Sequence, residues 1–210
     1  MKLEFDDKIK NVLTQYHKRI EMETALSGTL SFEERNERID EFLLPVGEAT
    51  GMFLNEMVKS SQSKIILELG TSYGYSTIWL AEAARVNDGK IITMEMSNEK
   101  ANYAQQKIKE AGLSEYVEFR VGNALEYLAT ATEIFDFVLL DIWKELYVPC
   151  FDLFFPKLNK DAWVIADNMI YPPHSHAESA AYRIRVKETN DFNTILLPIG
   201  SGLELSQFKN

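Results

Sequence analysis

Apolar positions follow two different patterns along the chain, and the change between them comes near residue 64. Before it, apolar residues recur at three- and four-residue steps, as on one face of an amphipathic helix. The first such face is formed by Ile9, Val12, Leu13, Tyr16 and Ile20. After residue 64, short apolar runs alternate with helical stretches. The chain therefore divides into a helical first part and an α/β second part.

Two more helices are predicted in the first part. Ser31 followed by Glu34 matches a capping box, in which each residue bonds the backbone of the other at a helix start. The inner face of the helix that it opens would hold Ile39, Phe42 and Leu43. Pro45 ends that helix or begins the next. The buried stripe of this third helix is predicted to be Val46, Ala49, Phe53 and Met57. We expect residues 1–63 to be a helical extension that serves as a lid or a dimerisation surface.

The second part, residues 64–210, predicts a mostly parallel sheet. Its apolar runs lie at residues 65–69, 91–94, 117–121, 137–140 and 162–166. Helical stretches lie between them near residues 74–84, 98–111, 123–129 and 145–158. Such alternation is typical of βαβ units. Two further runs, 194–199 and 203–207, flank Gly200-Ser201-Gly202 and indicate a closing antiparallel hairpin. We expect a Rossmann-like, doubly wound α/β fold whose seven-stranded sheet has five parallel strands and this hairpin.

Composition narrows the class of partner. The chain has 210 residues, with 22 Lys and Arg against 32 Asp and Glu, which gives a formal net charge of −10. That balance argues against binding to duplex nucleic acid or to an anionic membrane surface, because both need a basic face. No apolar run approaches the ~18 residues that a membrane span requires. The expected partner is therefore a small molecule.

The single cysteine, Cys150, excludes an intrachain disulfide and favours a cytoplasmic protein. It stands in an apolar run, so we expect a buried, unreactive thiol. Residues 1–7 are acidic and lack the apolar core of a signal peptide. Both observations favour the cytoplasm.

Polar residues follow every predicted parallel strand, at the ends where ligands bind in an open α/β sheet. The first strand leads into Glu68, Gly70, Thr71, Ser72, Tyr73, Gly74 and Ser76. The later strand ends hold Glu95 and Met96, Asn123 and Ala124, Asp141, and the pair Asp167 and Asn168. A sheet that served only as a scaffold would not need polar residues at each of these ends. The sequence therefore predicts the functional site at this edge.

The first of these turns has glycines at a G-x-x-x-G spacing, Gly70 and Gly74. A dinucleotide fingerprint needs G-x-G-x-x-G so that the backbone can approach a pyrophosphate, and Ser72 stands where its middle glycine belongs. Glu95, 25 residues after Gly70, stands where an acid would bind ribose hydroxyls. The pattern indicates a nucleoside without a pyrophosphate. S-adenosylmethionine fits, because its carboxylate can meet the amides at a helix start.

Five stretches that lie in order along the chain together resemble one family. They are ILELGTSYGYSTIWLAEA, ITMEM, FDFVLLDIWKELY, VIADN and LLPIGSGLELS. This set resembles the cation-dependent O-methyltransferases of the catechol and caffeoyl-CoA type, which are class I methyltransferases. The resemblance runs from about residue 45 to residue 208 and is most specific in GTSYGYS, the D-x-x-K-x-x-Y step and the Asp-Asn pair. It implies methyl transfer from S-adenosylmethionine to a small, aromatic vicinal-diol acceptor, and a homodimer.

The resemblance also implies roles for individual residues. Asp141, Asp167 and Asn168 would hold a divalent cation, and Mg²⁺ suits three hard oxygen ligands. Lys144 and Asp141 would be catalytic, with the lysine accepting the acceptor's proton or holding its phenolate. The cofactor-binding residues would be Glu68, Gly70, Thr71, Ser72, Tyr73, Gly74, Ser76, Glu95, Met96, Asn123, Ala124, Asp141 and Tyr147.

The chain departs from the family pattern in the acceptor loop and in two turns. Asn123 and Ser201 stand where the family often has Asp. His174 and His176 follow the Asp-Asn pair in a Pro-containing loop. One of them could be a metal ligand or a base, or both could be solvated loop residues.

Simpler readings also remain open for the site and for the function. Asp141, Asp167 and Asn168 could merely cap the helices that follow them, and Glu68 could be a buried acid with a structural role. The chain could bind S-adenosylmethionine without turnover. It could also be a nicotinamide-dependent oxidoreductase, which the G-x-x-x-G spacing disfavours.

Overall fold

The computed structural model describes residues 5–209, apart from the side chain of His174. Residues 1–4 of the acidic N-terminal segment and residue 210 lie outside this part. The described residues form one seven-stranded sheet with the order β3-β2-β1-β4-β5-β7-β6. The strands are β1 Ile65–Leu69, β2 Lys90–Glu95, β3 Val117–Val121, β4 Phe135–Leu140, β5 Leu158–Ala166, β6 Phe192–Leu197 and β7 Leu203–Phe208. β1 to β5 are parallel and β7 runs antiparallel to both β5 and β6, so the predicted fold class is confirmed.

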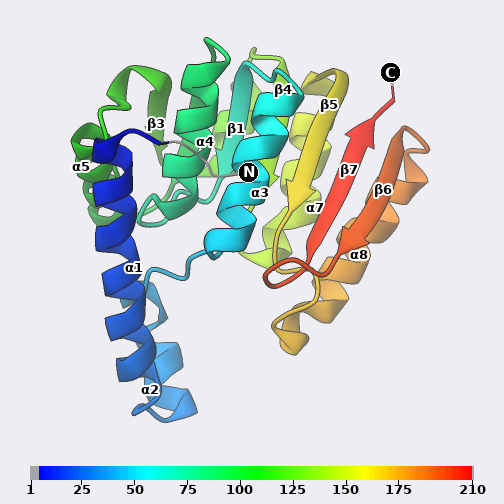
Figure 1. Cartoon of the computed structure of the whole chain (residues 1–210). Coiled ribbons are helices and arrows are strands. Elements are labelled where there is room, and N and C mark those ends of the chain that lie inside the picture. Colours follow the sequence, from blue (N-terminus) through cyan, green and yellow to red (C-terminus); the bar gives the residue numbers. More distant parts are fainter. Residues whose placement is uncertain (1–4, 210) are drawn as a thin grey trace.

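Helices cover both faces of this sheet (Figure 1). They are α1 Asp7–Ser27, α2 Phe32–Glu37, α3 Glu48–Ser60, α4 Tyr75–Val86, α5 Asn98–Glu110, α6 Ala124–Thr130, α7 Tyr147–Phe154 and α8 His176–Glu188. Short 3-10 helices lie at η1 Ile39–Glu41, η2 Ser114–Tyr116, η3 Lys144–Leu146, η4 Phe155–Lys157 and η5 Pro173–Ser175. The predicted helix at 145–158 is thus three short segments, and β5 begins where that helix was expected to end.

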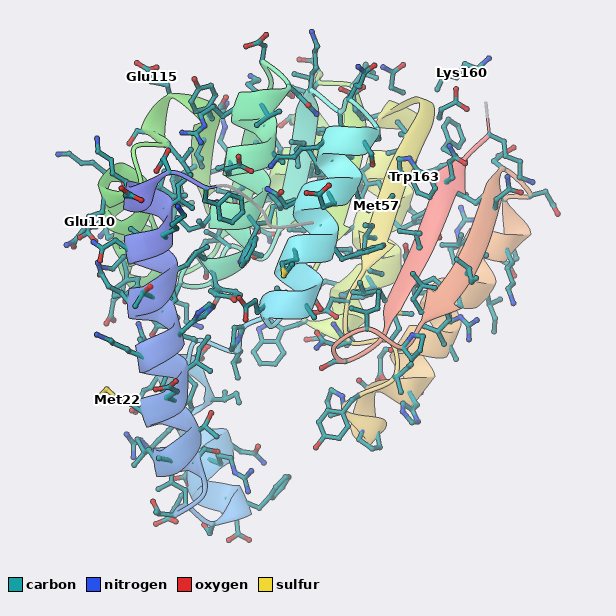
Figure 2. All side chains as sticks on the ribbon, viewed as in Figure 1. Met22, Met57, Glu110, Glu115, Lys160 and Trp163 are labelled. Carbon is teal, nitrogen blue, oxygen red and sulfur yellow. The ribbon has the colours of Figure 1, made fainter. Side chains whose placement is uncertain are left out.

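Two apolar cores lie on the two faces, because successive residues of a strand point to opposite sides. Ile66 of β1 joins a core with side chains of α1, α3, α4 and α5. Leu67 joins the other core, with side chains of α6, α7 and α8. Met57 of α3 and Trp163 of β5, both labelled in Figure 2, pack against the first core. The helices of the first 63 residues therefore share a core with the sheet.

The beginning of the chain follows its predicted pattern as far as Glu37. Ile9, Val12, Leu13 and Tyr16 are buried along α1. The capping box at α2 is present, with Ser31 N–H donating to Glu34 Oε2 at 2.8 Å and Glu34 N–H donating to Ser31 Oγ at 3.2 Å. The helix ends at Glu37, however, so Phe42 and Leu43 are buried from an irregular connector and not from a helix face.

The predicted buried stripe of the third helix is wrong as a helix face, although Val46 itself is buried. Val46 precedes α3, Ala49 is exposed, and Phe53 and Met57 are only partly buried. The buried face is formed by Thr50, Gly51, Leu54, Asn55 and Val58. A Cβ at Gly51 would lie 2.6 Å from the Trp79 indole, so α3 approaches α4 too closely for a larger residue. Small and polar residues occupy this contact, and a pattern that counts only apolar positions misses it.

The sequence predicts a loop after β5 as far as His176 and no helix before the hairpin, whereas the structure has α8 there. The loop ends one residue earlier, because His176 is the first residue of α8. The helix buries only Ser179, Tyr182 and Val186, and its other face is charged. So few apolar positions give a weak helical signal.

Two other expectations can be compared with the structure. Cys150 is buried on α7, which confirms the predicted burial, and burial raises the pKa of its thiol to about 12. Its low reactivity stays a prediction. Among residues 5–209, no helix is long and apolar enough to cross a membrane.

Candidate functional site

The carboxyl ends of the parallel strands meet at the edge that lies at the bottom of Figure 1, where the arrow of β5 points. The turn after β1 approaches the end of β4 very closely there. Gly70 has φ +107, and a Cβ at this position would lie 1.9 Å from the Asp141 carbonyl oxygen. Gly74 has φ +88 and precedes α4. Glycine is therefore required at Gly70 by both backbone conformation and space.

The acid after β2 holds this turn. Glu95 accepts a hydrogen bond from the Ser72 N–H at Oε2 and from the Ser97 N–H at Oε1, both at 2.8 Å. Ser72 itself lies in the left-handed region with φ 46. Each carboxylate oxygen has a further lone pair, so Glu95 could still accept hydrogen bonds from a ligand. Its predicted ribose contact stays a prediction.

Glu68 lies beneath the turn and is fully buried. Its carboxylate accepts from the hydroxyls of Ser76, Thr77 and Thr93 at 2.5–2.6 Å. Burial raises the pKa of Glu68 to about 7, although these hydrogen bonds oppose the change. The arrangement fits a carboxylate that joins β1, β2 and the start of α4. Its predicted contact with a cofactor stays a prediction.

Three other predicted cofactor residues lie at the ends of β2 and β3. Met96 follows β2 and is largely exposed. Asn123 caps α6 by accepting the Leu125 N–H at 2.9 Å, and Ala124 is buried as the first residue of that helix. Their roles stay predictions.

Two carboxylates lie after β4 and β5. Asp167 is buried, and burial, with repulsion from Asp141, raises its pKa to about 7. Burial also raises the pKa of Asp141, while the Lys144 ammonium opposes this change. Asp167 Oδ1 accepts the Asn168 N–H at 2.7 Å. Among the described residues, no donor bonds the carboxylate of Asp141.

Lys144 connects these groups. Its Nζ donates to Asn168 Oδ1 at 3.0 Å and to the hydroxyl of Tyr147. Burial lowers the pKa of Lys144, while the charges of Asp141 and Asp167 raise it. Tyr147 is fully buried, and its hydroxyl lies 2.9 Å from the Leu140 carbonyl oxygen. The structure thus brings Asp141, Lys144, Tyr147, Asp167 and Asn168 together.

The donor chemistry at Asp141, Asp167 and Asn168 fits a hard divalent cation. Asp141 and Asp167 repel each other, and the Asp141 carboxylate accepts no hydrogen bond from the part of the chain that the structure describes. Asn168 Oδ1 has a second lone pair beside the one that Lys144 uses. No group of three or more His, Cys, Asp or Glu side chains in the described part could hold a metal, so the set depends on the Asn168 amide.

The connector between η1 and α3, residues 42–47, covers this edge. Leu43, Leu44, Pro45 and Val46 line a small pocket with Gly70, Thr71, Ser72, Tyr75, Ser76 and Asp141. The sequence alone does not identify these connector residues as part of the site, because apolar residues beside a helix are typical of a core. Only the structure places them over the glycine turn.

The connector is held from α1 and from the glycine turn. Glu23 Oε2 accepts the Leu43 N–H at 2.8 Å, and Tyr73 OH donates to the Asp40 carbonyl at 2.9 Å. Arg19 donates to the Glu41 carbonyl at 3.0 Å, and its guanidinium stacks 4.2 Å from the ring centre of Tyr73. These contacts hold residues 43–46 in place over the pocket, and we call these residues the roof.

The loop after β5 is bound to the turn of the hairpin. Ile170 and Tyr171 N–H donate to the Ser201 carbonyl at 3.0 Å, and Met169 N–H donates to the Gly202 carbonyl at 2.9 Å. His176 Nε2 lies 2.7 Å from the Ile170 carbonyl oxygen, so this ring nitrogen bonds the backbone of the loop. The His174 side chain lies outside the described residues, and its possible roles stay open.

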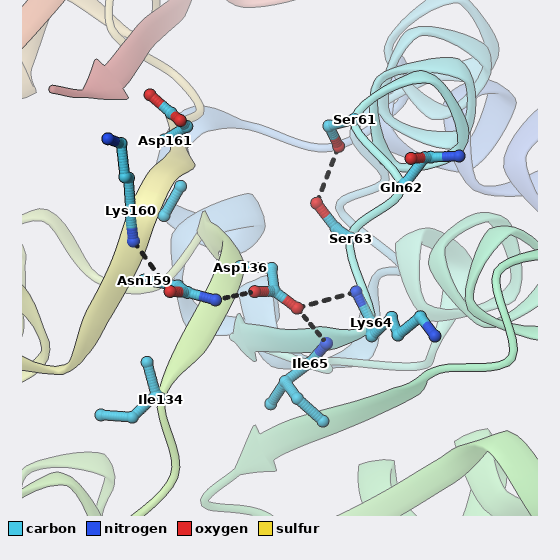
Figure 3. Close-up of a pocket in the computed structure, with 11 residues that line it drawn as sticks. Ser61, Gln62, Ser63, Lys64, Ile65, Ile134, Asp136, Asn159, Lys160 and Asp161 are labelled. Carbon is cyan, nitrogen blue, oxygen red and sulfur yellow. Dashed lines mark hydrogen bonds between the residues drawn. The ribbon is translucent and has the colours of Figure 1, made fainter. Parts of the chain in front are cut away.

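A second cavity, of about 470 Å³, lies at the opposite edge, where β1 and β4 begin (Figure 3). Asp136 accepts the Lys64 and Ile65 N–H groups at 2.9 Å and the Asn159 side-chain amide at 2.9 Å. The carboxylate in this cavity is therefore satisfied by the protein. None of the predicted site residues lines it.

Comparisons with known proteins identify the family of the chain. The family model described as O-methyltransferase matches residues 32–206. The chain is 37% identical over 131 residues to a catechol O-methyltransferase from Niastella koreensis, which covers 60% of this chain and 59% of that protein. It is 27% identical to caffeoyl-CoA O-methyltransferase 5 from Nicotiana tabacum, over 78% of this chain and 76% of that protein.

A solved structure has the same fold. The O-methyltransferase from Bacillus cereus in complex with SAH has a TM-score of 0.75 and 24% identity, and the match covers 99% of this chain and 93% of that one. The match to the Niastella koreensis relative spans about three-fifths of that protein's length.

Proposed function

The chain belongs to the O-methyltransferase family, and on that premise we propose that it transfers a methyl group from S-adenosylmethionine to one hydroxyl of a small aromatic vicinal diol. The observation that carries this proposal is the pairing of the unbonded Asp141 carboxylate with Lys144 and Asp167, next to the glycine turn. The catechol and caffeoyl-CoA relatives support the acceptor class.

The residues divide the work between donor and acceptor. The amides of the glycine turn and the carboxylate of Glu95 would bind the cosubstrate. Asp141, Asp167 and Asn168 would hold Mg²⁺, which when bound lowers the pKa of a diol hydroxyl beside it. Lys144 Nζ, whose pKa is lowered by burial, would take the proton of that hydroxyl. Tyr147 and Asn168 fix the direction of Nζ.

The roof would also exclude water from the pocket beside the glycine turn. Residues 43–46 lie over the glycine turn, and α1 holds them there. We therefore propose that the extension 1–63 acts as a lid on the cosubstrate side. A homodimer and a cytoplasmic location stay predictions from the sequence.

The experiment is a methyl-transfer assay with S-adenosylmethionine and catechol, in Mg²⁺ and again in excess chelator. We expect a methylated product with Mg²⁺ and its loss with chelator, restored by added Mg²⁺. Binding of S-adenosylhomocysteine without transfer to any diol would favour a non-catalytic binding protein instead. Equal turnover with chelator would contradict the cation's role.

A further inference from the structure

Two acidic side chains near the acceptor side have no charged partner among the described residues, whereas the basic side chains near them do. Glu48, the first residue of α3, and Glu145 of η3 are exposed. Within residues 5–209, neither carboxylate forms an ion pair or a hydrogen bond. Both stay free to act on a molecule that enters the site.

Both carboxylates stand on segments that border the site. α3 begins two residues after Val46, which lines the pocket, and a Cβ at Gly200 in the hairpin turn would lie 2.5 Å from Thr50 Oγ1. Glu145 directly follows Lys144.

Burial raises the pKa of Tyr75 to about 12, and the charge of Glu48 adds to this effect. Tyr75 lines the pocket beside Asp141. The charge of Glu145 likewise raises the pKa of Lys144, against the larger effect of burial. The two acids therefore belong to two different segments, Glu48 to the start of α3 and Glu145 to η3 after β4.

The basic side chains near this edge are neutralised or turned inward. Lys100 pairs with Asp40 at 2.6 Å, and Arg38 pairs with Glu41 at 2.7 Å. On the other side, Arg183 of α8 lies 3.0 Å from buried Glu204. Lys144 bonds within the site. These four cations are therefore each engaged within the protein and not with Glu48 or Glu145.

The same rim carries exposed apolar side chains. Trp143 is 57% exposed and Tyr171 is 63% exposed, with Leu44 and Ile170 also partly open to solvent. Exposed apolar groups that gather beside a polar site are typical of a ligand-binding groove. Aromatic faces also attract cations and not anions.

We propose that Glu48 and Glu145 are specificity-determining residues that make this site select against negatively charged acceptors. This inference rests on the proposed function and deepens it. An acceptor with a neutral or positively charged substituent enters an acidic, aromatic rim without repulsion. A carboxylate or a polyanionic thioester such as a coenzyme A conjugate is repelled by both carboxylates at once.

The test compares three acceptors that share one diol and differ in charge: 3,4-dihydroxybenzylamine, 3,4-dihydroxybenzyl alcohol and 3,4-dihydroxybenzoate. At pH 7 and low salt we expect kcat/KM to fall in that order, by about tenfold from amine to carboxylate, since two exposed charges each act weakly through water. The difference should lie in KM and should narrow in high salt.

The double variant Glu48→Gln with Glu145→Gln keeps the shape of both side chains and removes their charge. We expect it to reduce the amine-to-carboxylate ratio to within about twofold. Glu115→Gln is the matched control, because Glu115 is exposed at the opposite edge of the molecule (Figure 2) and should leave the ratio unchanged.

The outcomes separate this inference from the proposed function. If all three diols are methylated equally well, or if the ratio survives in the double variant, the charge selection is wrong while the methyltransferase stands. If none is methylated although S-adenosylhomocysteine binds, the proposed function fails, and this inference fails with it.

Discussion

The two halves of the site treat their carboxylates in opposite ways. On the cofactor side, Glu68 and Glu95 are surrounded by donors, three hydroxyls for the first and two backbone amides for the second. On the acceptor side, Asp167 accepts one backbone N–H, no described residue donates a hydrogen bond to the Asp141 carboxylate, and the two carboxylates repel each other. Both halves lie at the same edge of one sheet, so the difference comes from the side chains around each carboxylate and not from the backbone fold.

This difference indicates what each half does before a ligand arrives. Satisfied carboxylates fix a turn in one conformation, because each hydrogen bond to a buried charge is costly to lose. Buried carboxylates that repel each other raise the free energy of the empty site, and a cation or proton relieves that repulsion. The cofactor half is therefore held in one conformation before a ligand arrives. The acceptor half instead holds an electrostatic repulsion that a bound cation would relieve.

The largest effect should come from breaking the acceptor half alone. Lys144→Met removes the ammonium and keeps much of the stem, and we expect turnover to fall about 10³-fold, within the range for loss of a general base. S-adenosylhomocysteine affinity, measured by calorimetry, should stay within about tenfold of the native value.

Lys160→Met provides the control for Lys144→Met. Lys160 is exposed at the opposite cavity (Figure 3), so this change should alter neither turnover nor affinity. Native turnover in Lys144→Met would remove the lysine from the mechanism.

The next effect concerns the contact between the two halves. Gly70→Ala places a Cβ 1.9 Å from the Asp141 carbonyl oxygen at a positive φ, and we expect a loss of at least about 3 kcal/mol in the free energy of unfolding. Gly122→Ala, at φ +141 with open space around its Cβ, carries strain without a clash and should cost less. Urea denaturation measures both variants. Equal losses would show that the close approach to β4 is unimportant.

The smallest effect is a change in the pH dependence of stability on the cofactor side. The pKa of Glu68 is about 7 in the folded chain against an ordinary 4.5, so the folded state binds this proton more tightly. Its stabilising contribution is complete below pH 4.5 and is lost as the pH rises through 7, a change of at most about 3 kcal/mol.

Glu68→Gln cannot titrate and should show a flatter curve between pH 5 and pH 8, measured by urea denaturation without added metal. Asp167 titrates in the same range in both proteins, so the difference isolates Glu68. Parallel curves would mean that Glu68 keeps an ordinary pKa.

Local patterns were enough to predict much of the fold. The strands, the hairpin and the capping box each depend on residues that are near one another in sequence. The glycine spacing also predicted the turn whose closeness to Asp141 makes Gly70 necessary. Strand ends then brought Asp141 and Asp167 to one edge, because parallel strands share it.

What the sequence missed depends on contacts between distant segments. The buried face of α3 follows from the approach of Gly51 to Trp79. The partners of Glu68 include Thr93, on another strand. The roof over the site requires Leu43 to be held by Glu23 of α1. No periodicity within one segment encodes such pairs.

A calorimetric titration of the native protein with S-adenosylhomocysteine in Mg²⁺ buffer tests directly whether this edge of the sheet binds the cosubstrate. We expect saturable binding to one site per chain, with a dissociation constant on the order of micromolar. An absence of detectable heat and binding over that range would contradict the cofactor half of the site, and with it the proposed methyl transfer.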